Sequence, residues 1–196
     1  DSSGNVGINC TNPGQLLEIN GASNPCVLVK DTTNNCISYL YAQDSVATVG
    51  SASAHDFVIN VSNGEKARFD TNGRFLLGQT SADTDLGGYL QVVGTDYAKS
   101  SVLQARMSAN VYGPALDFLK SRNATWGSHT IVQNGDDLGR IYFRGDDGVD
   151  YGAAAALIMG EVDGTPGADD MPGRLTFHTS ADGANSPTER LRIDSS

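Results

Sequence analysis

Hydrophobic and polar positions alternate with a period of two along most of this chain, and residues 65–77 show the pattern most clearly. Phe69 precedes an Asn72-Gly73 pair, and Phe75 and Leu77 follow it. Alternation on both sides of Asn-Gly is typical of a β-hairpin, because these residues adopt the positive φ angles that a tight turn requires. The pattern therefore predicts an antiparallel hairpin.

The same motif recurs at both ends of the chain. Residues 189–196 read E-R-L-R-I-D-S-S and residues 1–8 read D-S-S-G-N-V-G-I. Joined through their shared D-S-S, they align with the middle copy without a gap. The Asp of the motif stands at positions 1, 70 and 194. A repeat of this kind indicates a structure built from stacked supersecondary units.

The repeat predicts the organisation of the chain. Module one covers 1–69, and module two covers 70–193 as a hairpin plus a larger β insertion over 97–188. Residues 194–196 begin a third repeat. We expect a Gly-Asn-Val-Gly-Ile-like strand to follow, either from further sequence or from a next copy stacked head to tail.

The other apolar runs are short and bounded by turn-forming residues, as is typical of strands. One helix is expected over about 153–161, where four alanines precede Leu157-Ile158-Met159. The sequence thus predicts an all-β fold with at most one short helix. The expected strands cover 16–19, 27–29, 37–42, 46–50, 57–61, 89–93, 103–107, 116–119, 141–144 and 175–177.

Composition supports the β assignment and excludes some partners. The 196 residues carry 13 Lys+Arg against 23 Asp+Glu, a net charge of −10, and 23 residues are Gly. Asp and Gly disfavour helix interiors. A phosphate backbone or an anionic membrane requires clustered cations, so neither nucleic acid nor membrane is an expected partner. The longest apolar run, 153–159, is too short to span a bilayer.

Metal and cofactor sites are not expected. Cys10, Cys26 and Cys36 form no C-x-x-C pair, and we interpret them as small buried thiols in a reducing compartment rather than ligands completed by His55. The Asp-rich segment 146–150 is interpreted as a turn, with a cation site as the alternative. Chelators are therefore expected to leave stability unchanged.

Each module has few large apolar side chains. A domain of about 69 residues buries only about 60% of its unfolded surface, and short strands leave open edges. Association with other copies would bury more apolar surface and cover the open strand edges, and stacking of repeats along one axis would do the same. We expect both association and stacking.

The motifs R-L-R-I-D-S-S and G-N-V-G-I, followed by Thr11-Asn12-Pro13, resemble the repeat of bacteriophage tail-fibre proteins. Residues 130–136, 163–177 and 186–190 resemble the shaft of such fibres. Cys10 departs from the family pattern, which usually has a small polar residue there.

The resemblance implies an elongated, intertwined homotrimeric fibre of β-hairpin and β-sandwich-like modules, in which three chains share one core. It implies a virion tail-fibre location outside the cell after assembly in the host cytoplasm, and adjacent fibre segments as partners. A self-cleaving chaperone domain would lie downstream or be absent. The apolar hairpin residues are expected to face the three-fold axis or a neighbouring chain: Val6, Ile8, Phe69, Phe75, Leu77, Leu191 and Ile193.

The best recognition candidate is the segment from Lys120 to Gln133. It holds the single Trp of the chain, and aromatic faces beside amide and guanidinium donors suit host carbohydrate. The alternative is that this Trp plugs the trimer interface. The candidate contact residues are Trp126, His129, Arg122 and Asn123.

No catalytic motif supports an enzyme. A fibre-borne glycan hydrolase or lyase that degrades host polysaccharide remains the alternative function. Its acidic pair cannot be identified among 23 acids, because some pair always meets the spacing of about 5–10 Å. The expected function is structural and adhesive.

Overall fold

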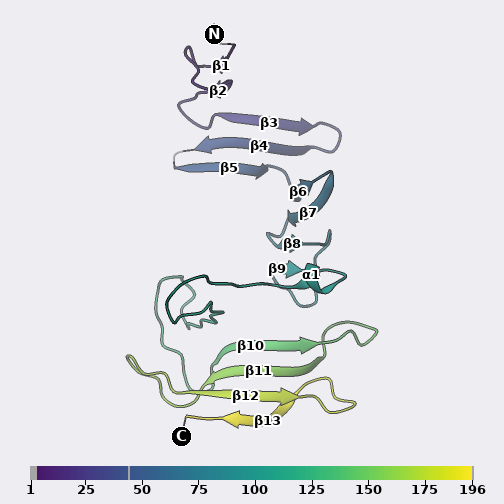
Figure 1. The fold of residues 1–196 in the computed structure, drawn as a ribbon, viewed down its shortest axis with the longest axis vertical. Helices are drawn as coiled ribbons and strands as arrows, with labels where there is room; N and C mark the ends of the chain where they lie inside the picture. The colour runs from purple at the N-terminus through teal and green to yellow at the C-terminus, as the bar shows by residue number, and fades with distance from the viewer. Residues whose placement is uncertain (1–3, 44, 196) are drawn as a thin grey trace. The chain divides into compact units, whose positions relative to one another are not determined.

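The structure is a computed structural model that describes residues 4–43 and 45–195, and it is nearly all β (Figure 1). The chain forms two compact units, Asp1–Ser101 and Val102–Ser196. The repeat-based module boundaries remain a prediction. The elements are β1 (Val6–Ile8), β2 (Leu17–Ile19), β3 (Cys26–Asp31), β4 (Cys36–Gln43), β5 (Val46–Ser51), β6 (Phe57–Val61), β7 (Gly64–Phe69), β8 (Phe75–Leu77), β9 (Leu90–Val92), α1 (Tyr97–Ser100), β10 (Asp137–Arg144), β11 (Ala154–Val162), β12 (Gly173–Thr179) and β13 (Thr188–Ile193).

The described residues of the first unit form three sheets. Strands β1 and β2 pair in parallel, β3–β4–β5 form an antiparallel meander, and β6–β7–β8–β9 form a four-stranded sheet. Within that last sheet β8 and β9 are parallel, whereas the other pairs are antiparallel.

The predicted hairpin over 65–77 is confirmed by β7 and β8, with Phe69 opposite Phe75. Their rings lie 4.9 Å apart between centroids. Gly73 supplies a positive φ of 80°. The Asp70 carboxylate accepts hydrogen bonds from the backbone N–H groups of Asn72 and Arg74, both at 2.9 Å. The Asp of the motif therefore caps the turn.

The second unit contains one antiparallel sheet in which β10, β11, β12 and β13 follow one another in chain order (Figure 1). Strand β11, with nine residues, is the longest strand of the described chain. This sheet holds the C-terminal copy of the motif as its last strand.

The helix expected over 153–161 is wrong, because this segment is strand β11. The alanines have high helix propensity, but a helix of this length needs tertiary support. Pairing with β10 on one side and β12 on the other satisfies its backbone groups instead. The helix present is α1, whose first turn is capped by the Asp96 carboxylate accepting from Lys99 N at 3.0 Å.

The strands expected over 103–107 and 116–119 are also wrong for the single chain. Residues 102–120 contain no strand, and every one of them is exposed. A strand is defined by hydrogen bonds to a neighbouring strand. This segment has the alternating pattern of a strand but has no ladder partner within the described chain. The remaining expected strands each overlap an observed one.

The core of the described chain is small. Its buried apolar residues are Ala67, Leu76, Val132, Ala154, Leu157 and Val162. The accessible surface is 14475 Å², whereas a compact monomer of 20.6 kDa would expose about 8,900 Å² and two separate bodies of half that mass about 10,700 Å². The chain thus leaves thousands of square ångströms uncovered.

Arginine forks stabilise the polar faces of two sheets. Arg68 donates from Nε and Nη2 to the two oxygens of Glu65, both at 2.7 Å, and Arg174 makes the same paired contact with Glu161 at 3.1 and 2.9 Å. The Arg68 hydrogen bond lowers the pKa of Glu65. Its stabilising contribution is therefore present above the ordinary carboxyl pKa and is lost as the pH falls below it.

Candidate functional site

The sheet of the second unit has one apolar face. Directly opposed residues of neighbouring strands point to the same side. The register places Ile141 opposite Ile158, Ile158 opposite Phe177, and Phe177 opposite Leu191. A second apolar row crosses the sheet beside it. It consists of Gly139, Gly160, Leu175 and Ile193.

The sheet β6–β9 has an equivalent apolar face. One row joins Phe57, Phe69, Phe75 and Leu90, and the next joins Ile59, Ala67, Leu77 and Val92. The opposite face carries Arg68 with its carboxylate partners. Each of these two sheets thus has one charged and one apolar side.

Both faces of the β3–β5 sheet carry apolar side chains. One face bears Leu28, Tyr39 and Tyr41, and the two tyrosine rings lie 4.9 Å apart. The other bears Val27, Leu40 and Val49 in opposed positions. A sheet with two apolar faces is typical of an element buried on both sides.

Five of the seven residues predicted to face the three-fold axis lie on these apolar faces, whereas Val6 and Ile8 lie in β1. Phe75 is half-buried. The other six are exposed, with relative accessibilities of 39–58%: Val6, Ile8, Phe69, Leu77, Leu191 and Ile193. None of the six is packed into the core of the single chain. Their position at a subunit contact stays a prediction.

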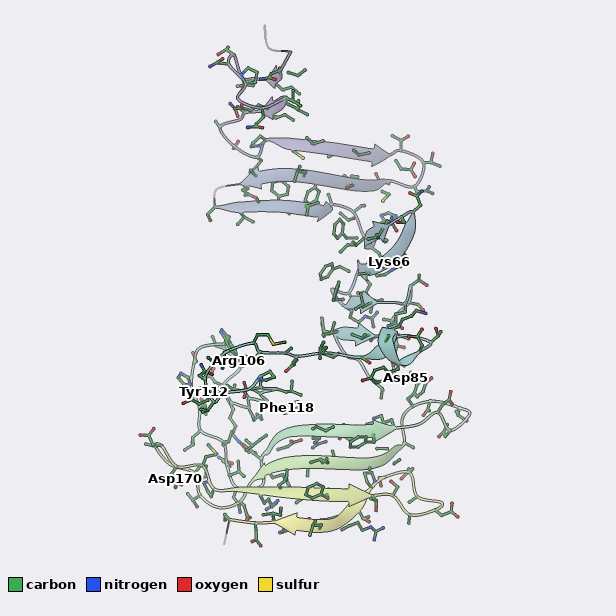
Figure 2. All side chains as sticks on the ribbon, viewed as in Figure 1. Lys66, Asp85, Arg106, Tyr112, Phe118 and Asp170 are labelled. Atoms are coloured by element: carbon green, nitrogen blue, oxygen red, sulfur yellow. The ribbon has the colours of Figure 1, made fainter. Side chains whose placement is uncertain are left out.

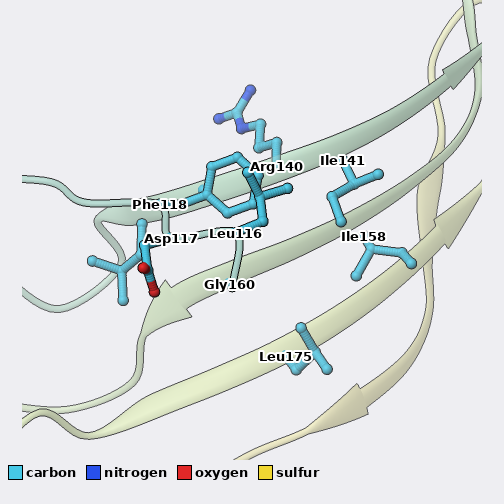
Figure 3. A pocket seen from close by; sticks show the side chains of 10 residues that line it. Leu116, Asp117, Phe118, Arg140, Ile141, Ile158, Gly160 and Leu175 are labelled. Carbon is cyan, nitrogen blue, oxygen red and sulfur yellow. The ribbon is translucent and has the colours of Figure 1, made fainter. Parts of the chain in front are cut away.

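One shallow pocket of about 260 Å³ lies on the apolar face of the second unit (Figure 3). Its lining includes Phe118, Ile141, Ile158 and Leu175. Phe118 lies directly over Gly139, since a Cβ added there would stand 2.5 Å from Phe118 Cβ. Gly160, the strand partner of Gly139, has open space above it. The glycine at 139 therefore admits the aromatic ring onto the sheet.

The four predicted recognition residues lie in one ordered loop of the second unit. Arg122 N donates to Thr130 O at 3.2 Å, Asn123 Nδ2 donates to Thr130 Oγ1 at 3.1 Å, and Gly127 turns the chain with a φ of 82°. The loop presents Trp126 with 92% of its surface accessible. His129 is also exposed.

Two of these four residues hold the loop in place. Arg122 makes a two-bond contact with Asp136, at 2.7 and 2.6 Å. The hydrogen bond from Arg122, followed by one from Gln133 N, holds the pKa of Asp136 well below its ordinary value. Arg122 and Asn123 therefore position the loop, whereas Trp126 and His129 are free to contact a ligand.

The carboxylates of the 146–150 segment are used within the turn. Asp146 accepts from Gly148 N at 2.8 Å, and Asp147 accepts from Val149 N at 2.9 Å and Asp150 N at 3.0 Å. Within residues 4–43 and 45–195, no group of three or more His, Cys, Asp or Glu side chains is placed to hold a metal ion. The three cysteines are free, but Cys26 is exposed and the other two are half-buried rather than buried.

The described part of the chain also contains no helix long and apolar enough to cross a membrane.

Hydrogen bonds connect three polar side chains on the charged face of the β10–β13 sheet, from His178 Nε2 to Thr176 Oγ1 at 2.9 Å and from Thr176 Oγ1 to Glu161. Thr176 is buried. Its hydroxyl is therefore shielded from solvent in the single chain.

Comparison with known proteins identifies a similar fold among solved structures. No protein-family model matches the chain, and no curated protein sequence matches it. The chain is similar in structure to the carboxy-terminal domain of the bacteriophage T5 L-shaped tail fibre, with a TM-score of 0.53 and 15% sequence identity. The match covers 89% of this chain and 78% of that chain. The chain therefore has the fold of a phage tail-fibre domain.

Sequence reasoning did not identify the apolar pocket or the role of Gly139. The available signal was a glycine within a strand, which marks a close approach of another segment. The approaching residue, Phe118, is 21 positions earlier in the sequence, and nothing in the local pattern relates the two.

Proposed function

We propose that this chain is a structural segment of a bacteriophage tail fibre that associates with two further copies of itself through its apolar sheet faces. The observation that carries the proposal is the set of apolar faces that the single chain leaves uncovered. The fold likeness to a phage tail-fibre domain supports it. The resulting trimer is a virion component with a structural and adhesive role, and it catalyses no reaction.

The size of the uncovered surface supports stable association. The chain exposes about 4,000 Å² more than two separate compact bodies of half its mass, on the surface–mass relation for monomers. Obligate protein interfaces bury about 2,000–5,000 Å² in total. The excess is thus large enough for each chain to contact two neighbours.

The segment 102–120 supports an intertwined arrangement. It alternates apolar and polar residues, has no strand partner within residues 4–43 and 45–195, and is exposed throughout. Strands of two other copies would supply the missing ladder bonds. The two strands expected at 103–107 and 116–119 would then form between chains.

The thiol of Cys26 offers a direct test of burial. This residue is exposed in the single chain and shares a face with Leu28 and Tyr39. In a variant with Cys10 and Cys36 replaced by Ser, we expect Cys26 to react with a maleimide far more slowly in the native protein than after unfolding. Mass spectrometry over time measures the reaction.

The matched control moves the thiol to the β3–β4 turn. In the same variant with Cys10 and Cys36 replaced by Ser, Thr33→Cys combined with Cys26→Ser places the single thiol at an exposed position away from the sheet faces. This thiol is expected to react at the rate of an open thiol. Equal rates at positions 26 and 33 would contradict association through the β3–β5 sheet.

A second role, recognition of host surface carbohydrate, is favoured by the exposure of Trp126 on an ordered loop. Trp126→Ala is expected to abolish binding to the host cell surface. The number of chains in the native assembly is expected to stay the same, because the loop is held by Arg122 and Thr130 and not by the indole. Cell-binding assays and native mass spectrometry measure the two effects. A fall in native mass would instead assign Trp126 to the subunit interface.

The alternative of a polysaccharide-degrading enzyme has less support. A glycosidase acid needs a raised pKa, whereas the carboxyl groups with a resolved shift in the described chain have lowered values, as for Asp136 and Glu65. Turnover of host capsule or lipopolysaccharide by the purified chain would favour this alternative.

A further inference from the structure

We infer that Asp136 is the positioning residue of the loop that carries Trp126. Its carboxylate ties the two ends of this loop together, so that the indole stands in its outward position before any ligand binds. We call residues 121–133 the recognition loop. The inference deepens the second role proposed above, recognition of host surface carbohydrate, and rests on it.

Asp136 joins the entrance of the recognition loop to its exit. At the entrance, Arg122 donates from Nε to Asp136 Oδ2 at 2.7 Å and from Nη2 to Asp136 Oδ1 at 2.6 Å. At the exit, the backbone N–H of Gln133 donates to Asp136 Oδ2 at 3.0 Å. The two bonds from the guanidinium are charge-assisted and bidentate, which is the strong kind of hydrogen bond. Removing the negative charge would therefore loosen both ends of the loop at once.

Asp136 can hold the loop because its own backbone is fixed to the β10–β13 sheet. Asp136 O accepts from Val162 N, and Val162 O accepts from Gly135 N, both at 2.9 Å. Val162 ends strand β11 and is fully buried. The turn before Asp136 is attached as well, since Gly164 N donates to Asn134 Oδ1 at 3.0 Å. The carboxylate therefore connects the recognition loop to a fixed part of the sheet.

Further hydrogen bonds order the recognition loop above its ends. Thr130 O accepts from Arg122 N at 3.2 Å, and Ser121 Oγ accepts from Asn123 N at 3.0 Å. Asn123 Oδ1 accepts in turn from Thr125 N at 2.9 Å. Ser and Asn side chains commonly bond the backbone two residues further on and so stabilise a turn. These bonds are made by backbone groups and short polar side chains, and none of them involves the indole.

Trp126 contributes little packing to the loop of the single chain. Its side chain is almost fully exposed, and Gly127 turns the chain directly after it. Tryptophan is on average a highly buried residue, because its ring has a large apolar surface. A loop that is ordered without its tryptophan keeps this surface available for a partner. Because the loop is ordered in advance, binding does not have to supply the cost of ordering it, and the affinity is higher.

Asp136→Asn tests the positioning role, because it preserves the size of the side chain and removes its charge. Trp126 is the single tryptophan of the chain, so the fluorescence anisotropy of the full protein reports the motion of this loop. The anisotropy is expected to fall in the variant, since a released loop moves on the nanosecond timescale. Binding of the labelled protein to intact host cells is expected to weaken about tenfold, the factor that corresponds to one charge-assisted hydrogen bond.

Asp137→Asn is the matched control. Asp137 is the next residue in the sequence and also pairs with an arginine, Arg140, but both members of this pair belong to strand β10. The same loss of charge is expected to leave the anisotropy of Trp126 and the binding to host cells unchanged. Circular dichroism and native mass verify that both variants keep their β structure and their association.

Three results would overturn the inference. Equal anisotropy in Asp136→Asn and in Asp137→Asn would mean that the Asp136 carboxylate does not hold the loop. Weaker binding of Asp136→Asn with unchanged anisotropy would make Asp136 a ligand contact instead of a positioning residue. Lower anisotropy with undiminished binding would mean that the order of the loop does not affect recognition.

Trp126→Ala separates this outcome from that of the proposed function. Full binding of Trp126→Ala to host cells would overturn recognition by this loop, and the inference with it. Weakened binding of Trp126→Ala together with full binding of Asp136→Asn would leave recognition in place and overturn the positioning role alone.

Discussion

Phe69→Asp is expected to convert the associated protein to single chains. Phe69 lies at the centre of the apolar face of β6–β9, opposite both Phe57 and Phe75. In the single chain it is partly exposed, so a carboxylate there remains hydrated. At a subunit contact the same carboxylate would be buried without a partner, which costs several kcal/mol for each copy.

Lys66→Asp is the matched control for this substitution. It introduces the same carboxylate two positions from Arg68, on the polar face of the same strand, at an exposed residue (Figure 2). We expect its native mass to equal that of the unsubstituted protein. Circular dichroism verifies that both variants keep their β structure. If Phe69→Asp remained associated, this face would not be a subunit contact.

Gly139→Ala is expected to destabilise the second unit, because its new Cβ would overlap Phe118. The added atom would stand 2.5 Å from Phe118 Cβ and 2.6 Å from its Cγ. Phe118 must therefore leave the sheet, and such overpacking costs about 1–3 kcal/mol. The loss appears as a lower midpoint in thermal or denaturant unfolding.

Gly160→Ala provides the comparison, because Gly160 is the strand partner of Gly139 and has nothing within 4 Å of an added Cβ. This substitution is expected to leave the unfolding midpoint unchanged or to raise it slightly, since alanine is less costly than glycine in a strand. Equal destabilisation by both substitutions would mean that the contact with Phe118 does not matter.

The sequence pattern predicted the β7–β8 hairpin well because a hairpin is local. The alternation around Phe69, together with Asn72-Gly73, contains both strands and the turn within 13 residues. The alanine-rich segment 153–161 was mistaken for a helix because its propensity is local, whereas its two strand partners are distant. The strands expected at 103–107 and 116–119 failed for a related reason, since the pattern of a strand does not supply its neighbour.

The candidate site was predicted in part. The sequence grouped Trp126, His129, Arg122 and Asn123 into one segment, and they do lie in one loop. It did not separate the residues that build the loop from those that face outward. That distinction depends on Asp136, whose contact with Arg122 is formed by the fold of the loop and not by a recognisable motif.

Native mass spectrometry of the purified chain tests the central claim most directly. The account predicts a species of about 62 kDa, three times the chain mass of 20.6 kDa, that persists on dilution because obligate interfaces of this size dissociate little. A stable species of 20.6 kDa with folded β structure would contradict association through the apolar sheet faces.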